Sequence, residues 1–243
     1  MIGVPLNRAC VIMVTIWRNI LASYHGAAMR HLTLVLLFVF FPLLGYAQAW
    51  TPAERNVSVT LNGINSSTAT FAEVMSYSTL VVGIGHPLTQ FIYSMVRWDD
   101  RVFKDCLTSS FGLGLSVGLS YAAKLTYNRT RPFAAYPDDI VSHGAEGLGS
   151  SFPSNHTGMA FESATMLTLQ YRYWYVGVPA YLWACSVGYS RLALGAHYLS
   201  DVGIGAALGT VSAVACYYIN DAIWRRIDNR PLLKPKDTSA FEL

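Results

Sequence analysis

The sequence predicts an all-α fold, a polytopic membrane bundle of five to six transmembrane helices. Its composition and the spacing of its apolar runs predict this. Of the 243 residues, 53% are hydrophobic and only 13% are charged, and the charged fraction is about half that of an ordinary soluble domain. Beyond residue 73 there are apolar runs at 74–96, 106–123, 157–171, 174–189 and 202–220. Each run is near the length that crosses hydrocarbon as a helix.

The N-terminal region has the layout of a secretory signal peptide. Residues 32–45 are almost wholly apolar, follow Met29-Arg30-His31 and precede Ala47-Gln48-Ala49. We expect Met29 to be the true start and residues 1–28 to be an upstream extension. An uncleaved first membrane helix within residues 1–49 explains the same pattern equally well.

Residues 50–73 are rich in Asn, Ser and Thr. This composition predicts an exposed periplasmic segment that is partly irregular. Residues 74–223 then form the predicted membrane domain, and residues 224–243 form a basic tail.

Basic residues mark alternate breaks between the apolar runs. Arg97, Arg101 and Lys104 lie between the first pair of runs, Arg172 lies between the third and fourth, and the basic tail follows the last. The positive-inside rule places these breaks in the cytoplasm. The breaks at 124–156 and 190–201 then face outward, on one side of the membrane.

The same composition excludes some classes of function. A net charge of +3, with no basic stripe interleaved with aromatic residues, argues against nucleic-acid binding. The cysteines are scattered without metal-ligand spacing and resemble small buried apolar residues. The sequence therefore predicts neither a metal ion nor another cofactor.

The outward breaks contain cations that oppose the charge bias of the rest of the chain. These residues are Lys124, Arg129, Arg131 and Arg191. A bound anion explains them, because two or three cations can neutralise a phosphate and an arginine can hold two of its oxygens. Anchoring at the membrane interface is the alternative for each residue taken alone.

His197 and Asp201 are four residues apart, where one helical turn brings two side chains together. A carboxylate that binds one ring nitrogen fixes the tautomer and leaves the other nitrogen free to attack phosphorus. An ion pair that caps a helix is the alternative.

Pro153-Ser154-Asn155-His156-Thr157 precedes an apolar run, which predicts a turn into a helix with free backbone N–H groups. His156 at such a position can act as a general acid on a leaving oxygen. Ser154 or Thr157 could instead cap the helix, and His156 could be a surface histidine without a role.

Together these residues form the pattern K-x6-R-P, P-S-x-H and S-R-x5-H-x3-D over residues 124–201, which resembles the type 2 phosphatidic acid phosphatase family. The resemblance implies a helical core and a metal-independent phosphatase that passes through a phosphohistidine. By motif position, His197 is similar to the family's nucleophile and Asp201 to its orienting carboxylate. His156 is similar to the acid that protonates the leaving group and then activates water.

The resemblance also implies a set of phosphate ligands: Lys124, Arg131, Ser154, Arg191 and the backbone N–H of Asn155. The family usually has glycine where this chain has Asn155. Asparagine tolerates unusual backbone angles well, so we expect the N–H donor to persist and the added side chain to narrow the pocket.

We therefore expect a multi-pass enzyme of the bacterial inner membrane whose site faces the periplasm and removes phosphate from a lipid. Lipid A and undecaprenyl pyrophosphate are favoured, and phosphatidic acid and phosphatidylglycerophosphate are possible. A secreted acid phosphatase acting on soluble phosphomonoesters is one alternative, with the apolar runs as core helices. A membrane protein that binds or transports lipid phosphates without turnover is another.

Overall fold

The computed structural model describes residues 52–144 and 149–227, and within them every regular element is a helix. The predicted all-α class is confirmed. The helices are α3 (Pro52–Asn62), α4 (Ser66–Arg97), α5 (Asp100–Thr126), α6 (Pro132–Ala135), α7 (Asn155–Tyr171), α8 (Trp174–Ala193) and α9 (Leu199–Ile227). The predicted signal peptide and most of the basic tail lie outside the described residues.

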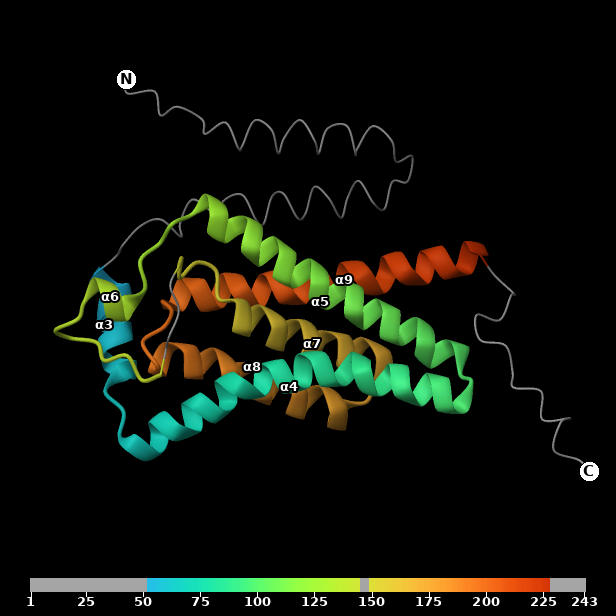
Figure 1. Ribbon diagram of the computed structural model, residues 1–243, viewed down its shortest axis with the longest axis horizontal. Coiled ribbons are helices and arrows are strands. Elements are labelled where there is room, and N and C mark those ends of the chain that lie inside the picture. The colour runs from blue at the N-terminus through green and yellow to red at the C-terminus, as the bar shows by residue number, and fades with distance from the viewer. Residues whose placement is uncertain (1–51, 145–148, 228–243) are drawn as a thin grey trace, which may run out of the picture. The chain divides into compact units, whose positions relative to one another are not determined.

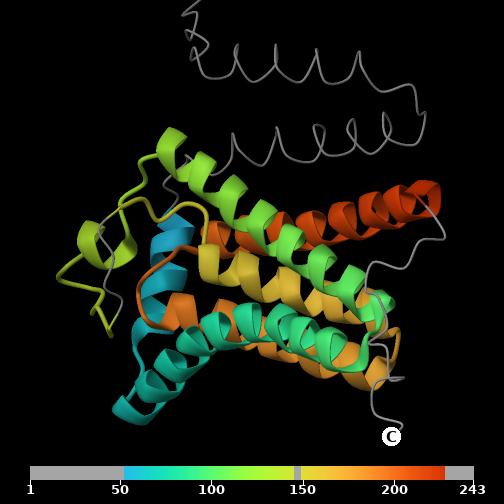
Figure 2. The same ribbon diagram turned by 45° about the vertical axis from the view of Figure 1, so that its right-hand side comes forward.

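Helix α7 is the centre of the bundle. It packs against α4, α5, α8 and α9, and it lies between them in both views of the ribbon (Figures 1 and 2). Helices α4 and α5 form an antiparallel hairpin, and α9 packs along α5 and α7. The short helices α3 and α6 lie together at one end of the bundle (Figure 1).

The helix ends follow local capping chemistry. Asn65 and Asp99 cap α4 and α5 by accepting hydrogen bonds from backbone N–H groups of the first turn. Helices α4 and α7 each end at a residue in the left-handed region, Trp98 with φ 54° and Arg172 with φ 58°. Both ends coincide with predicted breaks after an apolar run.

Helix α4 has the residue distribution of a helix that faces lipid. Its buried residues are small or polar: Ala69, Ala72, Ser76, Thr79, Gly83, Pro87, Gln90 and Ser94. Many of its large apolar side chains point outward instead: Phe71, Val74, Leu80, Val81, Ile84, Leu88, Phe91, Ile92 and Val96. A helix in water buries its large apolar side chains, whereas membrane helices pack through small and polar residues. This inverted pattern supports a membrane bundle.

Two of the described helices meet a strict test of length and hydropathy for a membrane span, Asp100–Thr126 and Leu199–Trp224. The other long helices, α4, α7 and α8, have 32, 17 and 20 residues. Helix α7 is one residue shorter than this test requires, and polar residues that face the bundle interior lower the mean hydropathy of α4.

Glycines allow α7 and α9 to approach closely. A Cβ atom on Gly209 would lie 2.0 Å from the carbonyl oxygen of Gly158, and one on Gly205 would lie 2.4 Å from that of Ser154. Gly205 and Gly209 form a small-xxx-small pair, a spacing that brings membrane helices into backbone contact. This crossing places the start of α9 against the start of α7.

The prediction that residues 50–73 form a partly irregular segment was wrong, because most of this range is helical. Helix α3 occupies most of it, and α4 begins at Ser66, eight residues before the predicted apolar run. The polar side chains of α3 that suggested exposure are in part buried, as Ser58 and Asn62 show. The Asn62 amide group donates to the carbonyl oxygens of Val141 and Ala193, which attaches α3 to the end of α8.

Candidate active site

The predicted site fragments meet at one end of the bundle. The end of α5, the start of α7, the end of α8 and the start of α9 converge beside α3 and α6 (Figures 1 and 2). The loop from residue 149 to residue 154 runs between them, and the backbone N–H of Ser154 donates to the carbonyl oxygen of Asp201 at 3.0 Å. Residues up to 146 positions apart in the sequence therefore share one small volume.

His197 lies in the loop between α8 and α9 and is only 2% exposed. Its Nδ1 atom is 2.6 Å from the carbonyl oxygen of Ser151. A carbonyl oxygen can only accept, so Nδ1 carries the proton and Nε2 keeps its lone pair. Nε2 lies 3.5 Å from Nη1 of Arg131. The nitrogen that is free to react therefore faces a cation.

The expected pairing of His197 with Asp201 is present as a charge contact, not as a hydrogen bond. His197 Nδ1 and Asp201 Oδ2 are 3.7 Å apart. His197 precedes α9 instead of lying on its first turn, so the two side chains are not stacked as i and i+4 residues of one helix. The main-chain oxygen of Ser151 takes the orienting role that the sequence assigned to the carboxylate alone.

Asp201 is fully buried, and its two oxygens have different partners. Oδ2 accepts a hydrogen bond from the backbone N–H of Tyr198 at 2.9 Å. Oδ1 lies 2.6 Å from Nη1 of Arg129. We expected an external anion to explain Arg129, but its anions are the protein's own carboxylates, Asp201 and Glu54, the latter at 2.6 Å from Nη2. Arg129 therefore differs from the other outward cations.

Arg131 and Arg191 lie near His197, and Lys124 lies near both arginines. Lys124 Nζ donates to the carbonyl oxygen of Ser150 at 2.8 Å, and Arg191 Nη1 donates to the Ser76 hydroxyl at 2.6 Å. The Nε atoms of Arg129, Arg131 and Arg191 are all buried and make no hydrogen bond within the described residues. Unlike Arg129, Arg131 and Arg191 form no ion pair with a described carboxylate, so their charge is available to a bound anion.

His156 lies on the first turn of α7, at the end of the bundle where the cations gather. Burial, together with repulsion from Arg191, Arg131 and Lys124, lowers its pKa to about 4. The pKa of His197 is likewise lowered, to about 3, chiefly by burial, and the opposing effect of Asp201 does not reverse it. Both imidazoles are therefore neutral at pH 7 in the free site.

Ser154 and Asn155 complete the predicted set. The buried Ser154 hydroxyl caps α7, with Thr157 N at 3.5 Å and Thr157 Oγ1 at 2.9 Å, which is the alternative role noted above. The Oδ1 atom of Asn155 is buried and makes no hydrogen bond within the described residues. Its side chain thus occupies space that a glycine would leave open.

A family model described as the PAP2 superfamily matches residues 106–225, which include all of these predicted site residues. The match begins within α5 and ends within α9. The chain belongs to the PAP2 superfamily. The predicted family is thereby confirmed, whereas the roles of individual residues stay predictions.

Several PAP2-type proteins are similar to this chain. A Porphyromonas gingivalis protein named lipid A 1-phosphatase is 33% identical over 131 residues, which are 53% of this chain and 26% of that protein. A Bacillus subtilis protein named undecaprenyl-diphosphatase BcrC is 33% identical over 85 residues, 35% of this chain and 42% of that protein. The chain thus spans about a quarter to two fifths of these relatives.

A solved structure shares the PAP2 fold with this chain. It is the transmembrane PAP2-type phosphatidylglycerolphosphate phosphatase of Bacillus subtilis, with a TM-score of 0.58 at 23% identity. The similarity covers 79% of this chain and 97% of that one. At this identity the likeness establishes the fold alone.

Sequence reasoning missed two residues of the site, Ser151 and Glu54. Ser151 contributes a main-chain oxygen, for which no sequence motif exists. Arg129 was named among the outward cations, but nothing in the sequence showed that its anions are Asp201 and Glu54. Glu54 lies in a segment judged to be irregular, so nothing in the sequence connected it with the site.

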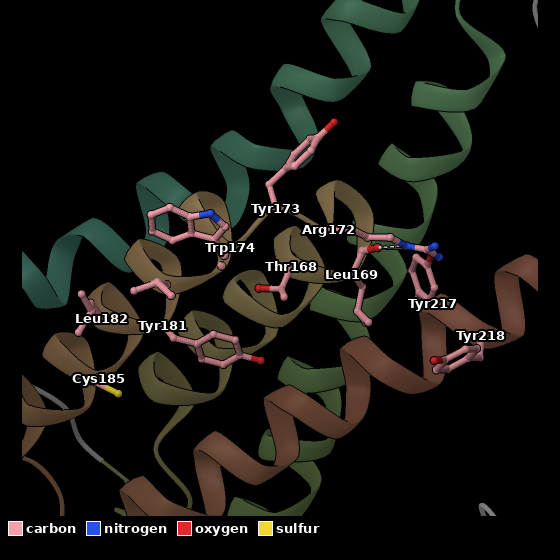
Figure 3. Close-up of a pocket in the computed structure, with 12 residues that line it drawn as sticks. Thr168, Leu169, Arg172, Tyr173, Trp174, Tyr181, Leu182, Cys185, Tyr217 and Tyr218 are labelled. Carbon is pink, nitrogen blue, oxygen red and sulfur yellow. Dashed lines mark hydrogen bonds between the residues drawn. The ribbon is translucent and has the colours of Figure 1, made fainter.

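A large furrow lies elsewhere in this PAP2 bundle. It has a volume of about 790 Å³ and runs beside the end of α7 and along α8 and α9 (Figure 3). Tyr173, Trp174, Tyr217 and Tyr218 line it together with Arg172. Since Arg172 ends α7 and His156 begins it, the two places are about 24 Å apart along the helix at 1.5 Å per residue. None of the predicted site residues lines this furrow.

Proposed function

We propose that this protein is a metal-independent membrane phosphatase that hydrolyses a lipid phosphate through a phosphohistidine on His197. The observation that supports this most is the state of the His197 ring. Nδ1 carries a proton and donates it in a hydrogen bond to the Ser151 carbonyl oxygen. Nε2 lies 3.5 Å from Arg131 Nη1 and keeps its lone pair. Such an arrangement presents a nitrogen nucleophile beside a cation that can hold the phosphoryl group.

In the first step, Nε2 of His197 bonds to phosphorus and the bond from phosphorus to the lipid oxygen breaks. Lys124, Arg131 and Arg191 offset the charge on the phosphoryl oxygens throughout. His156 gives a proton to the departing oxygen. In the second step, His156 takes a proton from water, the water oxygen bonds to phosphorus, and His197 leaves with its lone pair restored.

The low pKa of His156 is compatible with this role only when substrate is bound. A phosphate dianion between the cations cancels their repulsion and raises the pKa of His156, so the acid forms in the complex. The free site keeps the same imidazole neutral. The substrate's own charge thus prepares the group that protonates its leaving oxygen.

The substrate is a lipid that presents phosphate at the membrane surface, and lipid A is the first candidate. The Porphyromonas gingivalis relative, which aligns over 131 residues, is named lipid A 1-phosphatase. Undecaprenyl pyrophosphate is the second candidate, because the Bacillus subtilis relative is named undecaprenyl-diphosphatase. The positive-inside pattern supports a site at the periplasmic face of a bacterial inner membrane. The inverted residue pattern of α4 argues against a secreted enzyme with soluble substrates.

Phosphate release from a panel of purified lipids in detergent tests the proposal. We expect turnover of lipid A or undecaprenyl pyrophosphate by the wild type, no turnover by His197→Ala, and no effect of EDTA. Orthovanadate should still raise the thermal stability of His197→Ala, because its cations remain. Full activity of His197→Ala, or loss of wild-type activity in EDTA, contradicts this mechanism. Binding of a lipid phosphate without phosphate release would favour a binding or transport protein.

A further inference from the structure

Four ionisable side chains form one continuous line from α3 to the reactive histidine. Glu54 Oε2 is 2.6 Å from Arg129 Nη2, and Arg129 Nη1 is 2.6 Å from Asp201 Oδ1. The other oxygen of Asp201 faces His197 Nδ1 at 3.7 Å. The exposed fractions of the side chains of Glu54, Arg129 and Asp201 are 17%, 5% and 0%. The line therefore lies mostly out of water, where charges act on one another strongly.

Both Nη atoms of Arg129 are paired and one face of its guanidinium is covered, while its buried Nε has no hydrogen-bond partner within the described residues. Its guanidinium lies over the ring of Tyr198 at 4.1 Å, and Nη1 also donates to the Ser200 hydroxyl at 2.7 Å. Glu54 contacts the same region twice, because its Oε1 accepts a hydrogen bond from Ser200 N at 3.2 Å. The carboxylate on α3 thus joins Arg129 to the first turn of α9, which carries Asp201.

The charges in this line do not cancel. Two carboxylates share one guanidinium, which leaves one negative charge beside His197. In the proposed reaction, the imidazole becomes positive when Nε2 bonds to phosphorus, so a net negative neighbour stabilises that state. Without Glu54, the positive charge of Arg129 would offset Asp201 fully. The field of Asp201 at the ring would then be weaker.

We propose that Glu54 is a positioning residue of the active site, which acts through Arg129 to keep the charge of Asp201 available to His197. Helix α3 is then a fourth fragment of the site, beyond the three that the family motifs define. This inference rests on the proposed phosphohistidine function.

The substitution Glu54→Gln tests it, because glutamine keeps the size and the acceptor oxygen and removes only the charge. The matched control is Asp139→Asn, which likewise replaces a carboxylate by an amide. Asp139 is exposed and pairs with Arg55, which lies on α3 next to Glu54. For a lipid phosphate that the wild type hydrolyses, we expect Glu54→Gln to lower kcat about tenfold, the lower range for loss of an outer partner of a reactive histidine. KM and inhibition by sulfate should stay within about twofold, since the phosphate-binding cations are untouched.

Glu54→Asp restores the charge and should recover part of kcat, which a role in packing alone would not produce. A kcat for Glu54→Gln equal to that of Asp139→Asn overturns the inference. So does a parallel loss of kcat, sulfate inhibition and thermal stability in both Glu54 variants, because that result means α3 only supports the fold. A wild-type protein that releases no phosphate from any lipid overturns the proposed function directly and needs no variant.

Discussion

At the scale of single residues, the arginines of the site differ in their ion pairs. Arg129, Arg131 and Arg191 each keep a buried Nε donor without a partner among the described residues, but both Nη atoms of Arg129 are paired with carboxylates, whereas Arg131 and Arg191 form no ion pair there. The three arginines are similar in sequence context, and only their partners distinguish them. Substitutions at these positions should therefore have different kinetic effects.

Arg191→Lys should lower kcat/KM by about 10²-fold or more, because an ammonium cannot reproduce the two-point geometry of a guanidinium. Arg191 Nη1 is committed to Ser76, so the remaining nitrogens must serve the phosphate. The measurement is steady-state phosphate release in detergent. Arg97→Lys, at the exposed end of α4, is the control and should leave kcat/KM unchanged. Equal activity of both variants would show that Arg191 only anchors α8.

The affinity for a dianion should rise as the pH falls from 7 toward 4. The pKa of His156 is about 4 in the free site, and a bound dianion raises it, so binding takes up a proton. Sulfate is a suitable probe because it stays a dianion across this range. The inhibition constant of sulfate should therefore become smaller as the pH falls from 7 toward 4 in the wild type, and it should change less in His156→Gln. An identical pH dependence in both proteins would assign the proton to another group.

At the scale of elements, the site depends on how closely α7 and α9 cross. The start of α9 brings Asp201 to the loop before α7, and this approach is possible because Gly205 and Gly209 have no side chains. Gly209 on α9 lies against Gly158 on α7, two residues after His156, and it sets the spacing of the two helices. The motif residues are therefore positioned by glycines outside the motifs.

Gly209→Ala should destabilise the protein, because its Cβ would lie 2.0 Å from the carbonyl oxygen of Gly158. Overpacking of this kind costs about 1–3 kcal/mol, which lowers Tm by about 3–10 °C in a domain of this size. Gly203→Ala is the matched control, since nothing lies within 4 Å of its Cβ and alanine favours a helix. Thermal unfolding in detergent measures both. Equal Tm values would contradict the close crossing.

The sequence predicted the elements that carry a repeated pattern and missed those that depend on partners. The apolar runs lie within α4, α5, α7, α8 and α9, with α4 starting earlier than expected. Helix α3 was missed because its polar residues look exposed until the partners of Asn62 are known. The same limit applies to the site. Motif spacing indicated His197 and Arg131, but no pattern indicated a carbonyl oxygen at Ser151 or a carboxylate at Glu54.

At the scale of the whole molecule, the bundle has two unlike ends. One end holds the cations with their buried carboxylates, and the other holds the turn at Trp98 and the turn at Arg172. On the basis of the positive-inside pattern, we propose that the second end faces the cytoplasm. The proposed orientation is thus a property of the entire bundle and can be tested without any enzymatic assay.

A cysteine at Asp138 should react with a membrane-impermeant thiol reagent applied to the periplasmic side, and a cysteine at Trp98 should not. Both side chains are exposed, and they lie at opposite ends of the bundle. The native cysteines would first be replaced by alanine. Labelling of the Trp98 cysteine alone would show that the protein has the opposite orientation. As a control, both cysteines should react after detergent lysis.

The hydrogen bond from His197 to Ser151 has a consequence for genetic screens. The acceptor is part of the polypeptide backbone, so every amino acid at position 151 supplies it. A saturation library would record position 151 only through the bulk it tolerates, since the site is fully buried. A survey of tolerated substitutions would therefore report only a size limit at this position, although its main-chain oxygen determines which nitrogen of the imidazole is reactive.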